Sequence, residues 1–531
     1  MTRQRALTLC LWVGALHLLL LAWVCFRRIG YPFDVEWMEG GQLTHAVRLR
    51  QGLPLYARPS VDFTAFFYTP LYPVVVALLA PLGGGVGYAL GRAVSVAGTL
   101  ATLALLFWTL RREAGTRLAL LGAGTYAALD RFAGTFTSVA RADALALALA
   151  FAAVVLGYYG QGRRTALASA CLAVLAVFTK QTMVVLGGAL FLWLLLQERR
   201  RALWFGTAAL VLGVAGSLGL ERHSGGWFSF YVMMGHQTHA MHWDNLTFYF
   251  WRDVLFLAPA LLIVPLVWAW ARFGRGPVLV LASIHLAVAF LQRALTLDYP
   301  PHMYFRELAY ESPRWLLLVP PLVIAALLVR RGPRLEPLPL RGAFWLWMFG
   351  AALVSSALGH ATQWAYKNAF MPAALFGAVF LPLALRDLAP VRRSALVAMA
   401  LQLALLFDAP ASRLPSASDH AKAAALRQRI AAVQGPVLVL AHPLLAVEHD
   451  GRVHTHQMGL SDVAMSVGVE AFEAFAAAHA WAAVIVDAGD GLEVPSAIRA
   501  HYRRAEAIDG PWMKTGIRVR PAELWLPKLA P

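Results

Sequence analysis

The stretch ALTLCLWVGALHLLLLAWVCF occupies residues 6–26 and contains no Asp, Glu, Lys or Arg. A helix of about 20 apolar residues is long enough to cross the hydrocarbon core of a bilayer. Arg3 and Arg5 precede the run, and Arg27 and Arg28 follow it in place of a small-residue cleavage site. We therefore expect residues 6–26 to be an uncleaved first membrane span with the N-terminus in the cytoplasm.

Similar apolar runs continue to about residue 410. Of the 531 residues, 59% are hydrophobic and 14% are charged, whereas a soluble domain is roughly 45–50% apolar and about 25% charged. This composition excludes a soluble globular enzyme and a disordered or collagen-like chain. It predicts an α-helical polytopic membrane protein of about 13 transmembrane helices. The twelve spans after the first are expected at 89–110, 117–134, 144–160, 165–179, 182–197, 202–220, 254–271, 277–293, 314–329, 342–359, 369–385 and 394–408.

The net charge of +17 comes from the part of the chain that carries these runs. Residues 1–410 have 34 basic and 17 acidic side chains, and residues 411–531 have 12 of each. The excess falls in every second loop, which is typical of cytoplasmic loops and does not indicate nucleic acid binding. An odd number of spans then places residues 411–531 outside. The basic turns are Arg111-Arg112, Arg163-Arg164, Arg199–Arg201, Arg272/Arg275, Arg330/Arg331/Arg334 and Arg386/Arg392/Arg393.

Two segments outside the spans are large enough to carry function. Residues 28–88 form a first outer loop, in which we expect interfacial helices at about 38–51 and 69–82. A loop of this length is uncommon unless it is functional. Residues 411–531 alternate helical and apolar strand patterns, which predicts a small soluble α/β domain on the periplasmic side. The chain therefore divides into a membrane domain, residues 1–410, and this C-terminal domain, residues 411–531. In the C-terminal domain we expect helices at 421–433 and 469–478 and strands at 436–441 and 482–487.

The first outer loop opens with three acids, Asp34, Glu36 and Glu39. Glu39 also begins a predicted helix, where the helix dipole favours a carboxylate. One interpretation is a capping acid beside solvated loop acids. The other is a functional cluster, because charged groups close to a membrane are costly.

Further polar groups are expected on the same outer side. Each alone can be a side chain that reaches the lipid headgroups, but a convergent set of acids and cations favours a site. These groups are Arg141, Asp143, Lys180, Lys367 and Asn368.

A histidine series follows in the loop 221–253. His236, His239 and His242 have a spacing that can bind a metal, with Asp143 as another candidate ligand. The alternative is an interfacial surface of histidine and aromatic side chains. A divalent metal is thus possible, and no cofactor is certain.

Several motifs occur in an order that resembles a known family. A helix ends in Gly52-Leu-Pro-Leu-Tyr56, a proline-flanked stretch covers Tyr68–Pro73, and Arg92, Asp143 and the Thr179-Lys180 pair follow. Over roughly residues 1–410 the chain resembles the GT-C superfamily of polytopic glycosyltransferases. The nearest types are bacterial relatives of protein O-mannosyltransferases and lipid A aminoarabinose transferases.

The resemblance implies a sugar donor linked to a polyprenyl phosphate, an acceptor bound on the outer side, and inversion at the sugar carbon. The first-loop motif of the family is usually Asp-Glu, and here the matching pair is Met38-Glu39. Asp34 or Glu36 would then substitute for the missing acid. The resemblance further assigns Asp143 as the second outer-loop acid and Lys180 as a cation near the lipid phosphate. Some members of the family bind a divalent metal and others need none.

The residue types suit this chemistry. Charge that develops on a leaving phosphate needs cations beside it, for which Arg141, Lys180 and Lys367 are the candidates. A carboxylate, Glu39, Asp34 or Glu36, would orient or deprotonate the acceptor. Tyr68 and Asn368 are candidate contacts to donor or acceptor, and the acceptor can be a lipid, a polysaccharide or a protein.

Two other classes stay open. A secondary transporter or flippase of a lipid-linked sugar would usually show paired repeats, and none is visible. A non-catalytic membrane scaffold would present the C-terminal domain, and the Met38 departure supports it.

The Ala- and Arg-rich, Lys-poor composition suggests a GC-rich bacterium, so we expect the chain in the inner membrane.

Overall fold

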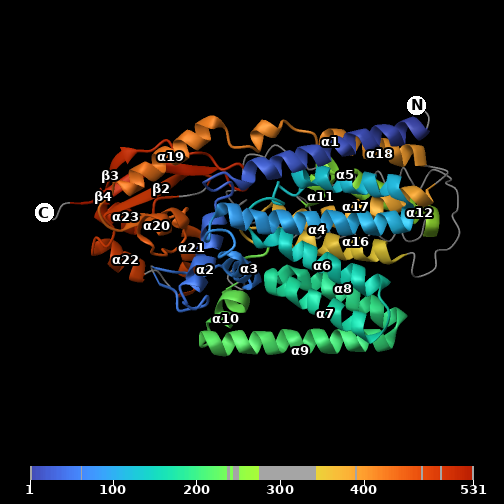
Figure 1. Cartoon of the computed structure of the whole chain (residues 1–531), viewed down its shortest axis with the longest axis horizontal. Coiled ribbons are helices and arrows are strands. Elements are labelled where there is room, and N and C mark those ends of the chain that lie inside the picture. The colour runs from blue at the N-terminus through green and yellow to red at the C-terminus, as the bar shows by residue number, and fades with distance from the viewer. Residues whose placement is uncertain are drawn as a thin grey trace, which may run out of the picture.

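The computed structural model describes residues 3–60, 62–235, 239–242, 245, 250–273, 343–388, 392–467, 470–490 and 493–528. Long helices lie side by side along one direction, and a smaller part with a β-sheet caps one end of them (Figure 1). The helices of the bundle are α1 (Arg3–Ile29), α4 (Tyr88–Ala114), α5 (Thr116–Phe132), α6 (Ala142–Tyr159), α7 (Gly162–Thr179), α8 (Val184–Gln197), α9 (Arg199–Ser224), α11 (Phe250–Leu257), α12 (Ala260–Phe273), α16 (Phe344–Ala361), α17 (Met371–Asp387) and α18 (Arg392–Leu405).

Seven helices in the described ranges are long and apolar enough to cross a membrane. The count becomes eight if Ala395–Leu405 and Pro410–Ala431, bent by 52°, form one span. The expected span 254–271 is split into α11 and α12, which meet at Ala258 and Pro259. The expected spans 277–293 and 314–329 lie outside the described residues, so the total of 13 stays a prediction.

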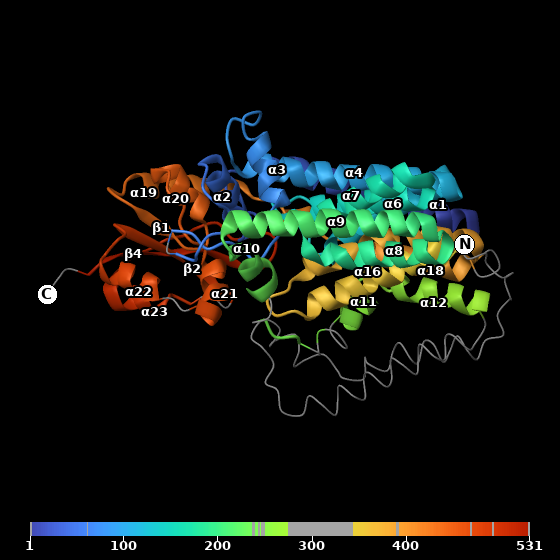
Figure 2. The same cartoon turned by 90° about the horizontal axis from the view of Figure 1, so that it is seen from below.

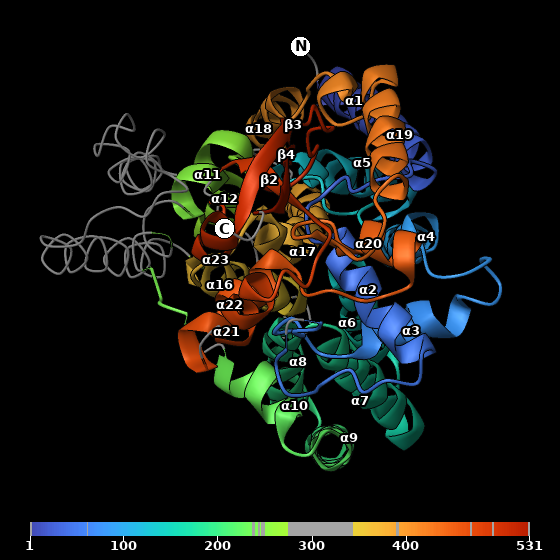
Figure 3. The ribbon, with the colours of Figure 1, turned by 90° about the vertical axis from the view of Figure 1, so that its left-hand side faces the viewer.

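Close packing in the bundle depends on small residues. Helices α1 and α5 cross where Gly14 faces Gly124, and a Cβ on Gly124 would lie 2.5 Å from the Gly14 Cα. Small residues let membrane helices approach each other closely. α17 lies inside the bundle and buries residues 371–385, whereas α9 runs along its periphery with Leu210 67% exposed (Figure 3).

The basic turns that the structure describes lie at the end of the bundle that carries the N-terminus (Figure 1). Arg386 Nη1 donates to the Glu113 carbonyl at 2.6 Å, which joins the turn after α17 to the turn after α4. The Arg112 guanidinium lies 4.8 Å from the Tyr159 ring centre at the end of α6. The basic turns of the described helices therefore share one end. Which end faces the cytoplasm stays a prediction, because the structure contains no membrane.

The first outer loop forms the two expected short helices, α2 (Glu39–Arg50) and α3 (Leu71–Leu79). α3 leaves Leu78 72% exposed, as a surface helix does. α2 differs from the expected interfacial helix, because its residues 39–46 are buried. It lies between the bundle and α20 (Pro443–Asp450) of the C-terminal part (Figure 2), so protein covers the face that we expected to meet lipid.

The C-terminal part holds a four-stranded sheet of order β1-β2-β4-β3. β1 and β2 are parallel, and β4 pairs antiparallel with both β2 and β3. The expected strands 436–441 and 482–487 overlap β1 and β2, and no strand was expected at β3 or β4. The elements are α19 (Ala417–Ala431), β1 (Val437–Val439), α20, α21 (Gln457–Val467), α22 (Glu470–Ala477), β2 (Ala483–Gly489), α23 (Ser496–His501), β3 (Tyr502–Ala507) and β4 (Val519–Pro527).

Candidate active site

Glu39, the first residue of α2, is bound on both carboxylate oxygens. Arg92 of α4 donates from Nε to Oε1 at 2.8 Å and from Nη2 to Oε2 at 2.6 Å. The backbone N–H groups of Ala140 and Val35 donate to the same two oxygens, each at 2.6 Å. Burial raises the pKa of Glu39, but Arg92 and these N–H groups outweigh it and hold the pKa below its usual range.

Arg92 extends this anchor to the end of α1. Its guanidinium also donates to the carbonyl oxygens of Arg28, Tyr31 and Phe33, at 2.9, 2.6 and 2.5 Å. Both Arg92 and Glu39 are fully buried. The pair therefore ties together α4, the start of α2 and the loop that connects α1 to α2.

Asp34 lies in the same loop and faces the C-terminal part. Its Oδ1 accepts from the Gly40 N–H at 2.6 Å, at the start of α2. Its Oδ2 accepts from the Tyr88 hydroxyl at 2.7 Å and lies 2.8 Å from His442 Nδ1. Asp34 is thus held by three donors and stabilises the N-terminus of α2.

Glu36, between these two anchors, has fewer partners. Its Oε1 accepts from Arg141 Nη1 at 3.0 Å, and its Oε2 accepts from the Met38 N–H at 3.2 Å. The side chain is 1% exposed. Burial raises the pKa of Glu36 more than Arg141 lowers it, to about 7. Glu36 therefore takes up a proton more readily than an exposed glutamate does.

Arg141 lies at the centre of a cluster of predicted site residues. Besides Glu36, its Nη2 donates to the Tyr68 hydroxyl at 2.8 Å, and its Nε lies 3.5 Å from Asp143 Oδ2. Nη1 also contacts the Met38 sulfur at 3.1 Å. Met38 therefore lies against this guanidinium.

Asp143 continues the cluster across three elements. Its Oδ1 forms an ion pair with Lys180, which follows α7, and accepts from Asn368 Nδ2 at 2.9 Å. The Lys180 side chain is 13% exposed, more than the Arg141 side chain at 6%. We call Glu36, Tyr68, Arg141, Asp143, Lys180 and Asn368 the central cluster.

The remaining candidates lie apart from the central cluster. Lys367 Nζ is 3.7 Å from Asp253 Oδ2 and is 31% exposed. His239 Nε2 lies 3.2 Å from Asp462 Oδ1 of α21. His236 lies outside the described residues. In the parts of the chain that the structure describes, no group of three or more His, Cys, Asp or Glu side chains can hold a metal.

Two residues at the site were missed in the sequence, His442 and Asp487. His442 follows β1, and Asp487 lies near the end of β2. Because the carboxyl ends of parallel strands meet at one edge of a sheet, side chains at these positions come together. That signal was available, since both strands were expected from their apolar runs.

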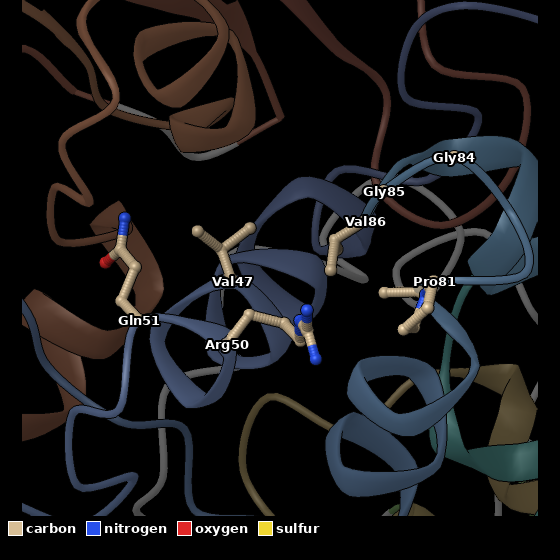
Figure 4. A pocket seen from close by; sticks show the side chains of 8 residues that line it. Val47, Arg50, Gln51, Pro81, Gly84, Gly85 and Val86 are labelled. Atoms are coloured by element: carbon tan, nitrogen blue, oxygen red, sulfur yellow. The ribbon is translucent and has the colours of Figure 1, made fainter.

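A pocket of about 410 Å³ lies elsewhere, between the end of α2 and the turn after α3 (Figure 4). It contains no member of the central cluster. Its lining residues are Val47, Arg50, Gln51, Ala80, Pro81, Gly84, Gly85 and Val86.

Comparisons with known proteins find similarity in fold. No family model and no curated protein sequence matches the chain. The structure is similar to ArnT from Cupriavidus metallidurans, with 16% identity over 97% of each chain, at TM-score 0.46 for the apo state and 0.45 for the state bound to undecaprenyl phosphate. It is also similar to the apo oligosaccharyltransferase of Archaeoglobus fulgidus, with 10% identity over 89% of this chain and 69% of that one at TM-score 0.42.

The matched structures are at most 16% identical to this chain, with TM-scores below 0.5. Their low identities and TM-scores do not determine the activity of this chain. The function is therefore argued from the contacts of the central cluster.

Proposed function

We propose that the protein is an inverting glycosyltransferase of the bacterial inner membrane. It moves a sugar from a polyprenyl-phosphate donor to a lipid, polysaccharide or protein acceptor at the outer face. One observation carries the proposal: Arg141 joins Glu36 of the first loop to the Asp143–Lys180 pair. A carboxylate suited to proton transfer and two cations suited to a phosphate thus share one network.

The cations serve the donor. When the bond between the sugar carbon and the phosphate oxygen breaks, the electron pair stays on the phosphate, which gains negative charge. Lys180 is the more exposed cation and contacts that phosphate, while Asp143 holds the ammonium in place. Tyr68 and Asn368 supply further hydrogen-bond donors beside it.

Glu36 serves the acceptor. The acceptor oxygen or nitrogen attacks the sugar carbon opposite the leaving phosphate, and its proton passes to the Glu36 carboxylate. A pKa of about 7 suits a general base at neutral pH. Glu39 and Asp34 have their oxygens occupied by Arg92, Gly40 and Tyr88, so we assign them to holding the loop.

The test follows release of polyprenyl phosphate by the purified protein in lipid, with a panel of polyprenyl-phosphate sugars. We expect Glu36→Gln to lower the rate about 10²-fold or more, and Lys180→Gln to lower it about 10²-fold. Glu448→Gln and Lys422→Gln are matched controls, because both side chains form partly exposed ion pairs in the C-terminal part. Release that continues unchanged in both cluster variants would overturn the proposal.

A non-catalytic scaffold is the second candidate, because every charge in the central cluster already has a partner. A paired network can simply join α6, α7 and the first loop. In that case the folded protein releases no polyprenyl phosphate from any donor. The cluster variants would then change the thermal stability alone.

A further inference from the structure

His442 lies between two carboxylates that come from different parts of the chain. Its Nδ1 is 2.8 Å from Asp34 Oδ2 in the first loop, and its Nε2 is 2.9 Å from Asp487 Oδ2 in β2. All three side chains are fully buried. The C-terminal part thus reaches the acidic loop through one imidazole.

The two carboxylates favour a charged imidazole. Both ring nitrogens face carboxylate oxygens, and a neutral imidazole has a single N–H to donate. Burial lowers the pKa of His442, but Asp487 and Asp34 outweigh it and raise the pKa to about 10. The ring of Phe33 lies against the imidazole, with its centre 4.7 Å away. The result is a charge-assisted pair of hydrogen bonds in a buried setting.

A second contact from the C-terminal part lies beside Glu36. The N–H groups of Lys514 and Thr515 both donate to the Val35 carbonyl, at 2.9 and 3.0 Å. A Cβ on Gly516, which has φ 78°, would lie 3.0 Å from Glu36 Oε1. The turn 514–516 therefore packs directly on the Glu36 carboxylate.

These contacts fix both sides of Glu36. His442 holds Asp34, the turn 514–516 holds Val35, and Arg92 holds Glu39. Glu36 is left with one orientation, toward Arg141. We propose that His442 is a positioning residue: the C-terminal domain completes the site by clamping the acidic loop so that Glu36 faces Arg141. This inference rests on the proposed function for its catalytic consequence, while the clamp itself is a physical property of the fold.

The test of the clamp measures amide hydrogen exchange of the full-length protein in lipid. In His442→Gln, Asp34 and Asp487 both lose their charged donor, so we expect exchange across residues 33–41 to be at least tenfold faster than in wild type, with the bundle helices unchanged. His449→Gln is the matched control, because His449 is partly exposed on α20 and bonds only the Gly435 carbonyl in the described structure. Equal protection of residues 33–41 in His442→Gln and wild type would overturn the proposal.

Asp487→Asn provides a second variant if His442→Gln does not fold. It keeps the shape of the side chain and removes one of the two charges that face His442. We expect a smaller increase in the amide exchange rate, about threefold, at residues 33–41. Faster exchange over the whole C-terminal part, with residues 33–41 unchanged, would contradict a clamp.

Kinetics separate positioning from general stability. Lys180 and Asn368 do not contact the clamp, so His442→Gln should lower kcat at least tenfold and leave the donor KM within twofold. A higher donor KM with an unchanged kcat in His442→Gln would contradict positioning of Glu36. If wild type releases polyprenyl phosphate from no donor, the proposed function fails, and hydrogen exchange still decides whether His442 clamps the loop.

Discussion

Glu36 and Glu39 lie three residues apart and are equally buried, yet their surroundings differ in the number of donors. Glu39 receives two guanidinium and three backbone hydrogen bonds, whereas Glu36 receives one of each. Burial penalises a charge unless donors compensate it. Glu39 therefore stays ionised as an anchor, and Glu36 keeps a pKa of about 7. Two carboxylates in one loop acquire different roles from their surroundings.

This difference predicts how the reaction depends on pH. Glu36 accepts a proton only when it is ionised, so the rate of polyprenyl phosphate release should be half of its maximum near pH 7, approach its plateau about one unit above, and fall towards about tenfold per pH unit below. The residual rate of Glu36→Gln should lose this inflection. A rate that is constant from pH 5 to 8 in wild type would contradict Glu36 as the base.

The helices of the bundle are held by close backbone contact as much as by apolar side chains. At the crossing of α1 and α5, Gly124 lies against the Gly14 backbone. Elsewhere a glycine costs helix stability relative to alanine. At this crossing it permits a separation that no other residue allows.

The crossing predicts opposite effects for two alanine substitutions. Gly124→Ala places a methyl group 2.5 Å from the Gly14 Cα, and overpacking of this kind costs about 1–3 kcal/mol. Gly213→Ala on the peripheral α9 meets nothing within 4 Å and should stabilise by up to about 1 kcal/mol. Thermal unfolding in the same detergent measures both, and equal midpoints would show that the crossing is not tightly packed.

The whole molecule has two unlike ends. One end gathers the basic turns around Arg112 and Arg386, and the other carries the first loop and the C-terminal sheet (Figure 1). The positive-inside bias predicts that the basic end faces the cytoplasm. The central cluster and His442 would then lie on the periplasmic side.

Reporter fusions test this orientation. Alkaline phosphatase fused to the C-terminus should be active, because the enzyme matures only after export. The same reporter fused after Ala114, in a basic turn, should be inactive. Activity in the reverse pattern would place the central cluster in the cytoplasm.

The local pattern of the sequence predicts most helices of the bundle, two of the strands and the residue types that we propose for the site. Apolar runs predict the helices and the two central strands, because burial of a continuous apolar segment is a local requirement. The acids Asp34 and Glu36 and the cations Arg141 and Lys180 were also found, since charges beside membrane spans are costly and therefore informative. Three of these four, Glu36, Arg141 and Lys180, meet in the central cluster with three further candidates, Tyr68, Asp143 and Asn368.

The pairing of those charges is decided only when the helices pack. Glu39 meets Arg92, and Asp34 meets His442, across 53 and 408 positions of the chain. No local pattern specifies such partners, because each depends on how α2, α4 and the C-terminal sheet come together. The same packing buries α2. It also surrounds Glu39 with more hydrogen-bond donors than Glu36, so the pKa of Glu39 is lowered while that of Glu36 is raised. Residue types along the chain thus determine which chemistry is possible, and the tertiary contacts decide which residue performs it.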